Sequence, residues 1–119
     1  MRTWRLELDC DLHAPWFARH ALRSWLHLVT CSDETKLDIT ILVSELITDA
    51  VLADGQRVSL TVTFDDGRVR IDVHATGAAP RPASTGDDTV SSRIADAVTD
   101  TWARTSQHGV AHTWAELLC

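Results

Sequence analysis

Alternating hydrophobic and polar residues predict β-strands in the first and middle parts of the chain. In residues 2–9, apolar side chains share one face and charged side chains the other, which is typical of a half-buried strand. Residues 58–64 alternate in the same way. The turn sequence Asp65-Asp66-Gly67 follows them, so the next strand is expected to complete a hairpin. The expected strands are 2–9, 58–64, 69–73, 102–105 and 113–118.

Apolar residues at helical spacing predict three helices, over residues 16–29, 33–53 and 90–98. Pro15 suits the first turn of the first helix, and Gly55 is a plausible stop for the second. The stripe expected to be buried on the first helix is Trp16, Phe17, Ala21, Trp25, Leu28 and Val29. The stripe expected on the second is Leu37, Ile41, Leu42, Leu46, Ala50 and Ala53.

The order of these elements predicts an α/β fold. Residues 75–89 are expected to be a loop, because they contain two prolines, two glycines and no core pattern. Consecutive strands joined by short turns favour a mixed, mostly antiparallel sheet with the helices on one face. A length of 119 residues is typical of one domain, so we expect a single two-layer sandwich over residues 1–119.

Composition and charge exclude several classes of protein. The chain is 45% hydrophobic and 24% charged, as globular domains are, and no run of 18 apolar residues is present to span a membrane. The net charge is −6 and the 11 basic residues are scattered, which disfavours direct binding to nucleic acid. Charged residues at the N-terminus disfavour a signal peptide, so a cytoplasmic location is expected.

Cys10, Cys31 and Cys119 are the three cysteines. Their odd number and the lack of a CxxC spacing argue against a disulfide framework and against a zinc site. We therefore expect three reduced thiols, as in a cytosolic protein.

Residues 42–51, Leu-Val-Ser-Glu-Leu-Ile-Thr-Asp-Ala-Val, resemble the first nucleotide motif of the histidine-kinase-like (GHKL) ATPases. The similar branch is that of the small anti-sigma-factor serine kinases, which typically have SELVTNAVRHA. Residues 56–74 resemble the hairpin that follows, and residues 73–80 resemble VSDSGPGLP. Residues 94–102 resemble the helix end ALADRW, and residues 113–117 resemble the closing VWAEL. The resemblance spans nearly the whole chain and implies a Bergerat-type two-layer sandwich.

The resemblance also implies which positions would bind ATP, and several of them are substituted. The family's Mg²⁺-binding Asn is here Asp49, which is also a suitable oxygen ligand but adds negative charge near the phosphates. The Asp that hydrogen-bonds the adenine amino group is here Ala75. Leaving that donor unpaired costs about 1–3 kcal/mol, or roughly 5- to 150-fold in affinity. Ala79 replaces the second glycine of the same motif.

Two more segments of the implied nucleotide site differ from the family. The glycine-rich segment that approaches the phosphates is here Thr89-Val90-Ser91-Ser92, and a Lys-Thr pair is here Ala111-His112. Glu45, at the position of the general base, and Gly77 persist. These substitutions indicate a degenerate member of the family.

Without a nucleotide, the same positions have simpler interpretations. Glu45 and Asp49 are then expected to be solvated carboxylates on a helix, and Ala75 and Ala79 to be ordinary loop residues. The helix carboxylates lie four residues apart, where like charges repel slightly.

The resulting hypothesis is a regulatory protein-binding module in which ATP binding is lost or weak, so no cofactor is expected. The resemblance implies a sigma factor or an anti-sigma-factor antagonist protein as partner, with the sheet edge and the first helices as docking surface, and it makes a homodimer plausible.

Two alternatives remain open. The first is an active serine kinase, with Asp49 holding Mg²⁺ and Glu45 acting as the base. The second is a repurposed pocket that binds or converts another small molecule. It would lie between the helices and the loop 75–89, and some of the five tryptophans would line it.

Overall fold

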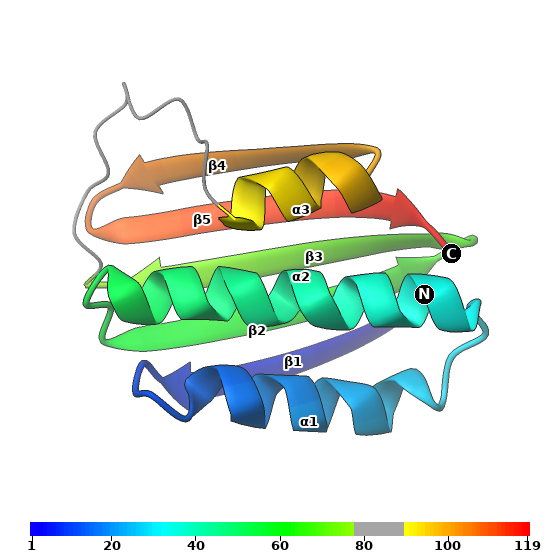
Figure 1. Ribbon diagram of the computed structural model, residues 1–119, viewed down its shortest axis with the longest axis horizontal. Coiled ribbons are helices and arrows are strands. Elements are labelled where there is room, and N and C mark those ends of the chain that lie inside the picture. Colours follow the sequence, from blue (N-terminus) through cyan, green and yellow to red (C-terminus); the bar gives the residue numbers. More distant parts are fainter. Residues whose placement is uncertain (78–89) are drawn as a thin grey trace.

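Three helices lie on one face of a five-stranded sheet in the computed structural model, which describes residues 1–77 and 90–119 (Figure 1). The helices are α1 (Ala14–Leu26), α2 (Asp33–Leu52) and α3 (Val90–Val98). The strands are β1 (Arg2–Asp9), β2 (Arg57–Asp65), β3 (Arg68–Thr76), β4 (Thr101–Gln107) and β5 (Val110–Leu118). The sheet order is β1-β2-β3-β5-β4, and every neighbouring pair is antiparallel. The expected two-layer α/β sandwich is confirmed.

The β2–β3 hairpin forms the centre of the sheet and follows directly from the sequence pattern. Asp65 pairs with Arg68, and the two residues between them have positive φ, 54° at Asp66 and 77° at Gly67. Two such residues make the turn whose twist suits a hairpin. Alternate side chains of both strands are buried beneath the helices, as predicted.

The stripe expected on helix α1 is buried only in part: Val29, just after the helix, is buried and Trp25 packs against the core, but Leu28 is 67% exposed. The buried row of the helix is Ala14, Ala18, Leu22 and Leu26, spaced four residues apart. The rings of Trp16 and Phe17, which were expected in the core, are 49% and 51% exposed. The periodicity correctly predicted a helix but not its orientation, because α1 carries two apolar rows. The row that begins with the small residues Ala14 and Ala18 is the one that packs against the sheet.

Helix α2 lies between α1 and α3 and also differs in part from the expected stripe (Figure 1). The buried residues are Ile39, Thr40, Leu42, Val43, Leu46, Ile47 and Ala50. Leu37 and Ile41, expected in the core, are 59% and 42% exposed. The burial of neighbouring pairs such as Leu42 and Val43 shows that α2 is covered over a broad face. The Ser32 side chain caps α2 by accepting a hydrogen bond from the Thr35 N–H at 3.1 Å.

A disulfide joins Cys31 to Cys119, so the expectation of three reduced thiols is wrong. The fold brings the two residues together although 88 positions separate them. The backbone N–H of Cys119 donates to the carbonyl of Gly67 at 2.8 Å, which holds the chain end beside the β2–β3 turn and the loop between α1 and α2. Cys10 is free. Reduced thiols were one argument for a cytoplasmic location, and disulfides are rare in the cytosol. That argument therefore no longer applies.

Two further expectations concern the rest of the chain. Residues 75 and 76 belong to β3 rather than to the expected loop 75–89, of which residues 78–89 lie outside the described residues. In the two described segments, no helix is both long enough and apolar enough to cross a membrane.

Candidate functional site

Asp49 is the centre of a polar cluster between the helices and the sheet. It lies near the C-terminal end of α2, and its Oδ2 accepts a hydrogen bond from the hydroxyl of Ser91 on α3. The same oxygen lies 3.3 Å from Nη2 of Arg104, which projects from β4. Nη2 also lies 3.2 Å from the Ser91 hydroxyl. Three separate elements therefore meet at one carboxylate oxygen.

Arg104 is held in this position from the sheet side. Its Nε donates to the hydroxyl of Thr113 on β5 at 3.3 Å, and its guanidinium carbon lies 5.8 Å from the ring centre of Trp102. Residues at alternate positions of a strand share a face, and Arg104 and Thr113 face the helices from paired strands. The side chains of Arg104 and Asp49 are only 14% and 21% exposed. The cluster is thus largely shielded from water.

Asp49 is therefore not the solvated helix carboxylate expected in the absence of nucleotide. A guanidinium has only hydrogen-bond donors, so Arg104 neutralises Asp49 and supplies nothing that binds a cation. Among residues 1–77 and 90–119, no group of three or more His, Cys, Asp or Glu side chains is arranged to hold a metal ion. In this arrangement the Asp49 carboxylate is engaged by Arg104 and Ser91.

Glu45 lies on α2 one turn before Asp49 and is partly exposed. The described residues give it no ion pair, whereas Ser44 beside it accepts a hydrogen bond from Arg19 on α1 at 3.0 Å. The expected solvated carboxylate agrees with this position.

The two predicted positions at the end of β3 have structural roles of their own. Ala75 pairs with Val58 of β2 and is buried, so it is a core residue rather than a loop residue. Gly77 has a φ of +74°, and its N–H donates to the carbonyl of Gly109 at 3.0 Å. A Cβ on Gly77 would lie 2.9 Å from Cγ of Gln56. Glycine is thus required by the backbone here, and its persistence does not itself indicate a ligand. Ala79 lies outside the described residues.

The segments that replace the family's remaining motifs are placed differently from one another. Ser91 belongs to the segment 89–92 and contacts Asp49, so two of the implied positions do meet. In the pair 111–112, the side chain of His112 points to the open face of the sheet, away from Arg104. The neighbouring Thr113 faces the cluster instead.

A second polar network, which the sequence did not indicate, covers the open face of the sheet. Arg70 donates two hydrogen bonds to Asp72, at 3.1 and 3.2 Å, and lies over the ring of Trp114. Nε2 of His112 lies 2.9 Å from Asp72, and the His112 ring stacks on that of His74 at 4.0 Å. Their paired register on adjacent strands makes these contacts.

The network shifts two pKa values. Burial pushes the pKa of Asp72 up, but hydrogen bonds and charges from Arg70 and His112 together hold it below its ordinary value. Burial lowers the pKa of His74, and the neighbouring His112 ring and Arg5 add to this against the opposing effect of Asp72. The network ties β3 to β5 on the polar side of the sheet.

Comparison with known proteins identifies the fold. The RsbU and RsbW domains of Rv1364c from Mycobacterium tuberculosis match 99% of this chain, with a TM-score of 0.80 and 19% sequence identity. The chain therefore shares the two-layer α/β sandwich fold of that structure. The SiaB–SiaC complex from Pseudomonas aeruginosa matches 98% of the chain, with a TM-score of 0.59 and 11% identity.

The two matches differ in how much of the other chain they cover. This chain spans 32% of the Mycobacterium tuberculosis chain and 89% of the Pseudomonas aeruginosa chain. No model of a protein family matches the sequence, and neither does any curated protein. At 19% and 11% identity, the likeness establishes a shared fold and leaves activity to be argued from the site.

Proposed function

We propose that this chain is a regulatory protein-binding module that acts without nucleotide, and that its partner is a sigma factor or an anti-sigma-factor antagonist protein. The fold supports the class of the proposal. One similar structure contains an RsbW domain and the other contains SiaB in a complex with SiaC. The second of these structures is a complex of two proteins, which agrees with a protein-binding role for this fold.

The observation that carries the proposal is the Asp49 cluster. Its carboxylate is neutralised by Arg104 and hydrogen-bonded by Ser91 at the position where the resemblance implies a metal ligand. An anionic ligand near this point would have to compete with Asp49 for Arg104, and a cation would have to displace that guanidinium. Both arguments favour a site closed by the chain's own side chains.

The outer face of α1 is a suitable surface for the partner. Trp16 stacks on His20 with ring centres 3.9 Å apart and meets Phe17 edge-on at 5.1 Å. Helix α1 also exposes Arg23 and carries no acidic residue, although the whole chain has a net charge of −6. Exposed aromatic and arginine side chains are enriched at the energetic centres of protein interfaces. The complementary surface on the partner is therefore acidic with an apolar pocket.

The kinase alternative makes demands that are harder to meet. It requires Asp49 to leave Arg104 and bind Mg²⁺, and Glu45 to accept a proton from a substrate hydroxyl. The small-molecule alternative places an apolar pocket between the helices and the loop 75–89, and residues 78–89 of that loop lie outside the described residues. A pocket that the described residues form between α2 and α3 has no tryptophan in its lining, which is Asp38, Ile41, Val90, Arg93, Ile94, Ala97 and Val98.

The test measures partner binding with and without nucleotide. A partner co-purified from the native host is titrated with the chain in EDTA and again in Mg-ATP. We expect equal affinities. Replacing Trp16 and Phe17 by alanine should weaken binding by about tenfold or more, whereas Glu45→Ala should leave it unchanged.

Two outcomes contradict the proposal. One is a requirement for Mg-ATP, and the other is a loss of function in a folded Glu45→Ala protein, which would show that Glu45 has a chemical role. A homodimer is part of the proposal as well, and sedimentation at several concentrations would measure it.

A further inference from the structure

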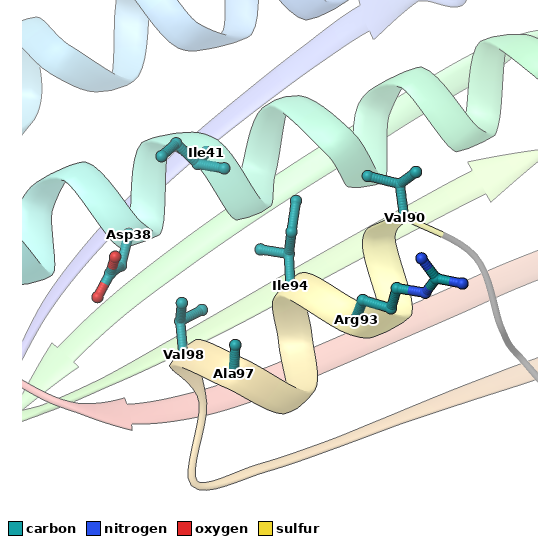
Figure 2. Close-up of a pocket in the computed structure, with 7 residues that line it drawn as sticks. All are labelled: Asp38, Ile41, Val90, Arg93, Ile94, Ala97 and Val98. Atoms are coloured by element: carbon teal, nitrogen blue, oxygen red, sulfur yellow. The ribbon is translucent and has the colours of Figure 1, made fainter.

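An apolar groove separates α2 from α3 on the outer side of the helix layer (Figure 2). Val90, Ile94 and Val98 recur every four residues along α3, and Figure 2 shows their side chains directed toward α2. Ile41 forms the opposite wall and is 42% exposed. The volume is about 360 Å³. The row from Val90 to Val98 is about 12 Å long, at 1.5 Å per helical residue, which matches two turns of another helix.

A carboxylate lies at one end of this groove. Asp38 projects from α2 toward the Val98 end of α3, while Arg93 lies near the Val90 end (Figure 2). Within the described residues Asp38 has no ion pair, and Glu34 is four positions before it on the same helix. Burial raises the pKa of Asp38, and the charge of Glu34 raises it further. A positive charge arriving at this end would offset both effects, because it stabilises the ionised carboxylate.

The backbone around the groove indicates what kind of chain it can accept. Its walls are two helices, whose backbone N–H and C=O groups are already hydrogen-bonded within each helix. An extended peptide in the groove would find no backbone partners for its own polar groups, whereas a helix satisfies them internally.

We propose that the α2–α3 groove binds an amphipathic helix of a partner protein, with apolar residues at i, i+3, i+4 and i+7 and a lysine or arginine beside Asp38. The groove is distinct from the aromatic face of α1. The inference rests on the proposed protein-binding role. The groove is tested with peptides and without nucleotide, so a failure of this inference can be distinguished from a failure of the proposed function.

The probe is a displayed library of helical peptides about 18 residues long, which is enough to form a helix on binding. Peptides selected on the wild-type protein are sequenced and then titrated by fluorescence anisotropy. We expect an apolar stripe with basic residues at one end. Ile41→Asp should weaken binding about tenfold or more. Leu12→Asp is the matched control that should leave binding unchanged, because Leu12 is 87% exposed and does not line the groove.

A charge exchange tests the orientation. Asp38→Lys should weaken binding of a lysine-bearing peptide about tenfold, and replacing that peptide lysine by glutamate should restore it. Ile41 and Asp38 lie outside the core, and circular dichroism checks that each variant is folded. If Ile41→Asp unfolds, Ala97→Trp is used instead to fill the groove, since Ala97 is exposed.

Several results would overturn the inference. The library could yield no binder, or binders without a helical apolar pattern, or binders unaffected by Ile41→Asp and Ala97→Trp. A failed charge exchange would also count against it. If the wild-type protein self-associates and Ile41→Asp makes it monomeric, a second copy of this chain occupies the groove instead.

Discussion

The contact between Asp49 and Arg104 should stabilise the fold measurably, and a double-mutant cycle can measure its contribution. Asp49→Asn and Arg104→Met each remove one charge while keeping most of the side-chain volume. The charged atoms are 3.3 Å apart, which corresponds to about 5 kcal/mol of gross attraction at an effective dielectric constant near 20. Desolvation of both groups offsets most of this, because each side chain is at least 79% shielded from water.

We therefore expect each single variant to lower the free energy of unfolding by about 1–3 kcal/mol, since it removes an ion pair from a charge that is shielded from water. The double variant should lose less than the sum, with a coupling energy of about 1–2 kcal/mol. Urea unfolding followed by circular dichroism measures all four proteins. Glu45→Gln, one turn away on the same helix, is the control and should change stability by less than about 0.5 kcal/mol.

The reasoning would be refuted by two results together. One is a change of less than about 0.5 kcal/mol in each single variant, which is what a solvated Asp49 would give. The other is strict additivity in the double variant. In that case the cluster would not hold α2, α3 and β4 together, and Asp49 would be free to take another ligand.

Three further predictions concern stability. Cys31→Ser or reduction should lower the free energy of unfolding by up to about 4–5 kcal/mol, because the disulfide closes a loop of 88 residues. Cys10→Ser should have little effect, since Cys10 is free. Equal urea midpoints with and without reductant would contradict this prediction. Leu46→Ala should lower the free energy of unfolding by about 2–5 kcal/mol because Leu46 is buried. Leu37→Ala, on the exposed face of α2, should lower it by less than about 0.5 kcal/mol. Similar losses for both variants would show that α2 buries a different face. The pKa of His74 in the folded protein lies below its ordinary value of 6.5, so the unfolded chain binds the proton first and the free energy of unfolding should fall as the pH drops from 7 through 6.5. His74→Gln should make this fall less steep when thermal unfolding is measured at several pH values. An unchanged pH dependence in the variant would contradict the prediction.

The sequence predicted those parts of the fold that depend on local patterns. The β2–β3 hairpin combines strict alternation with an Asp-Gly turn, and both signals lie within a few residues of each other. The start of α2 at Asp33, where the sequence predicts it, is also local, because the Ser32 side chain caps the helix. Such features are decided by short-range sterics and hydrogen bonds, so they can be read before the tertiary structure is known.

The features that the sequence did not predict depend on contacts between distant residues. Arg104 meets Asp49 across 55 positions, and nothing near either residue indicates the other. The disulfide of Cys31 and Cys119 depends on the β2–β3 turn lying beside the chain end. On α1, the small residues Ala14 and Ala18 allow close packing, which periodicity alone did not distinguish from a face of large aromatic rings.

Isothermal titration calorimetry with Mg-ATP tests the central claim most directly. Because Arg104 and Ser91 already engage Asp49 and Ala75 offers no acceptor to the adenine, we predict no saturable heat below about 1 mM nucleotide. Mg-ADP should behave in the same way. A saturable, Mg²⁺-dependent isotherm with a dissociation constant in the low micromolar range would contradict the account and favour the kinase.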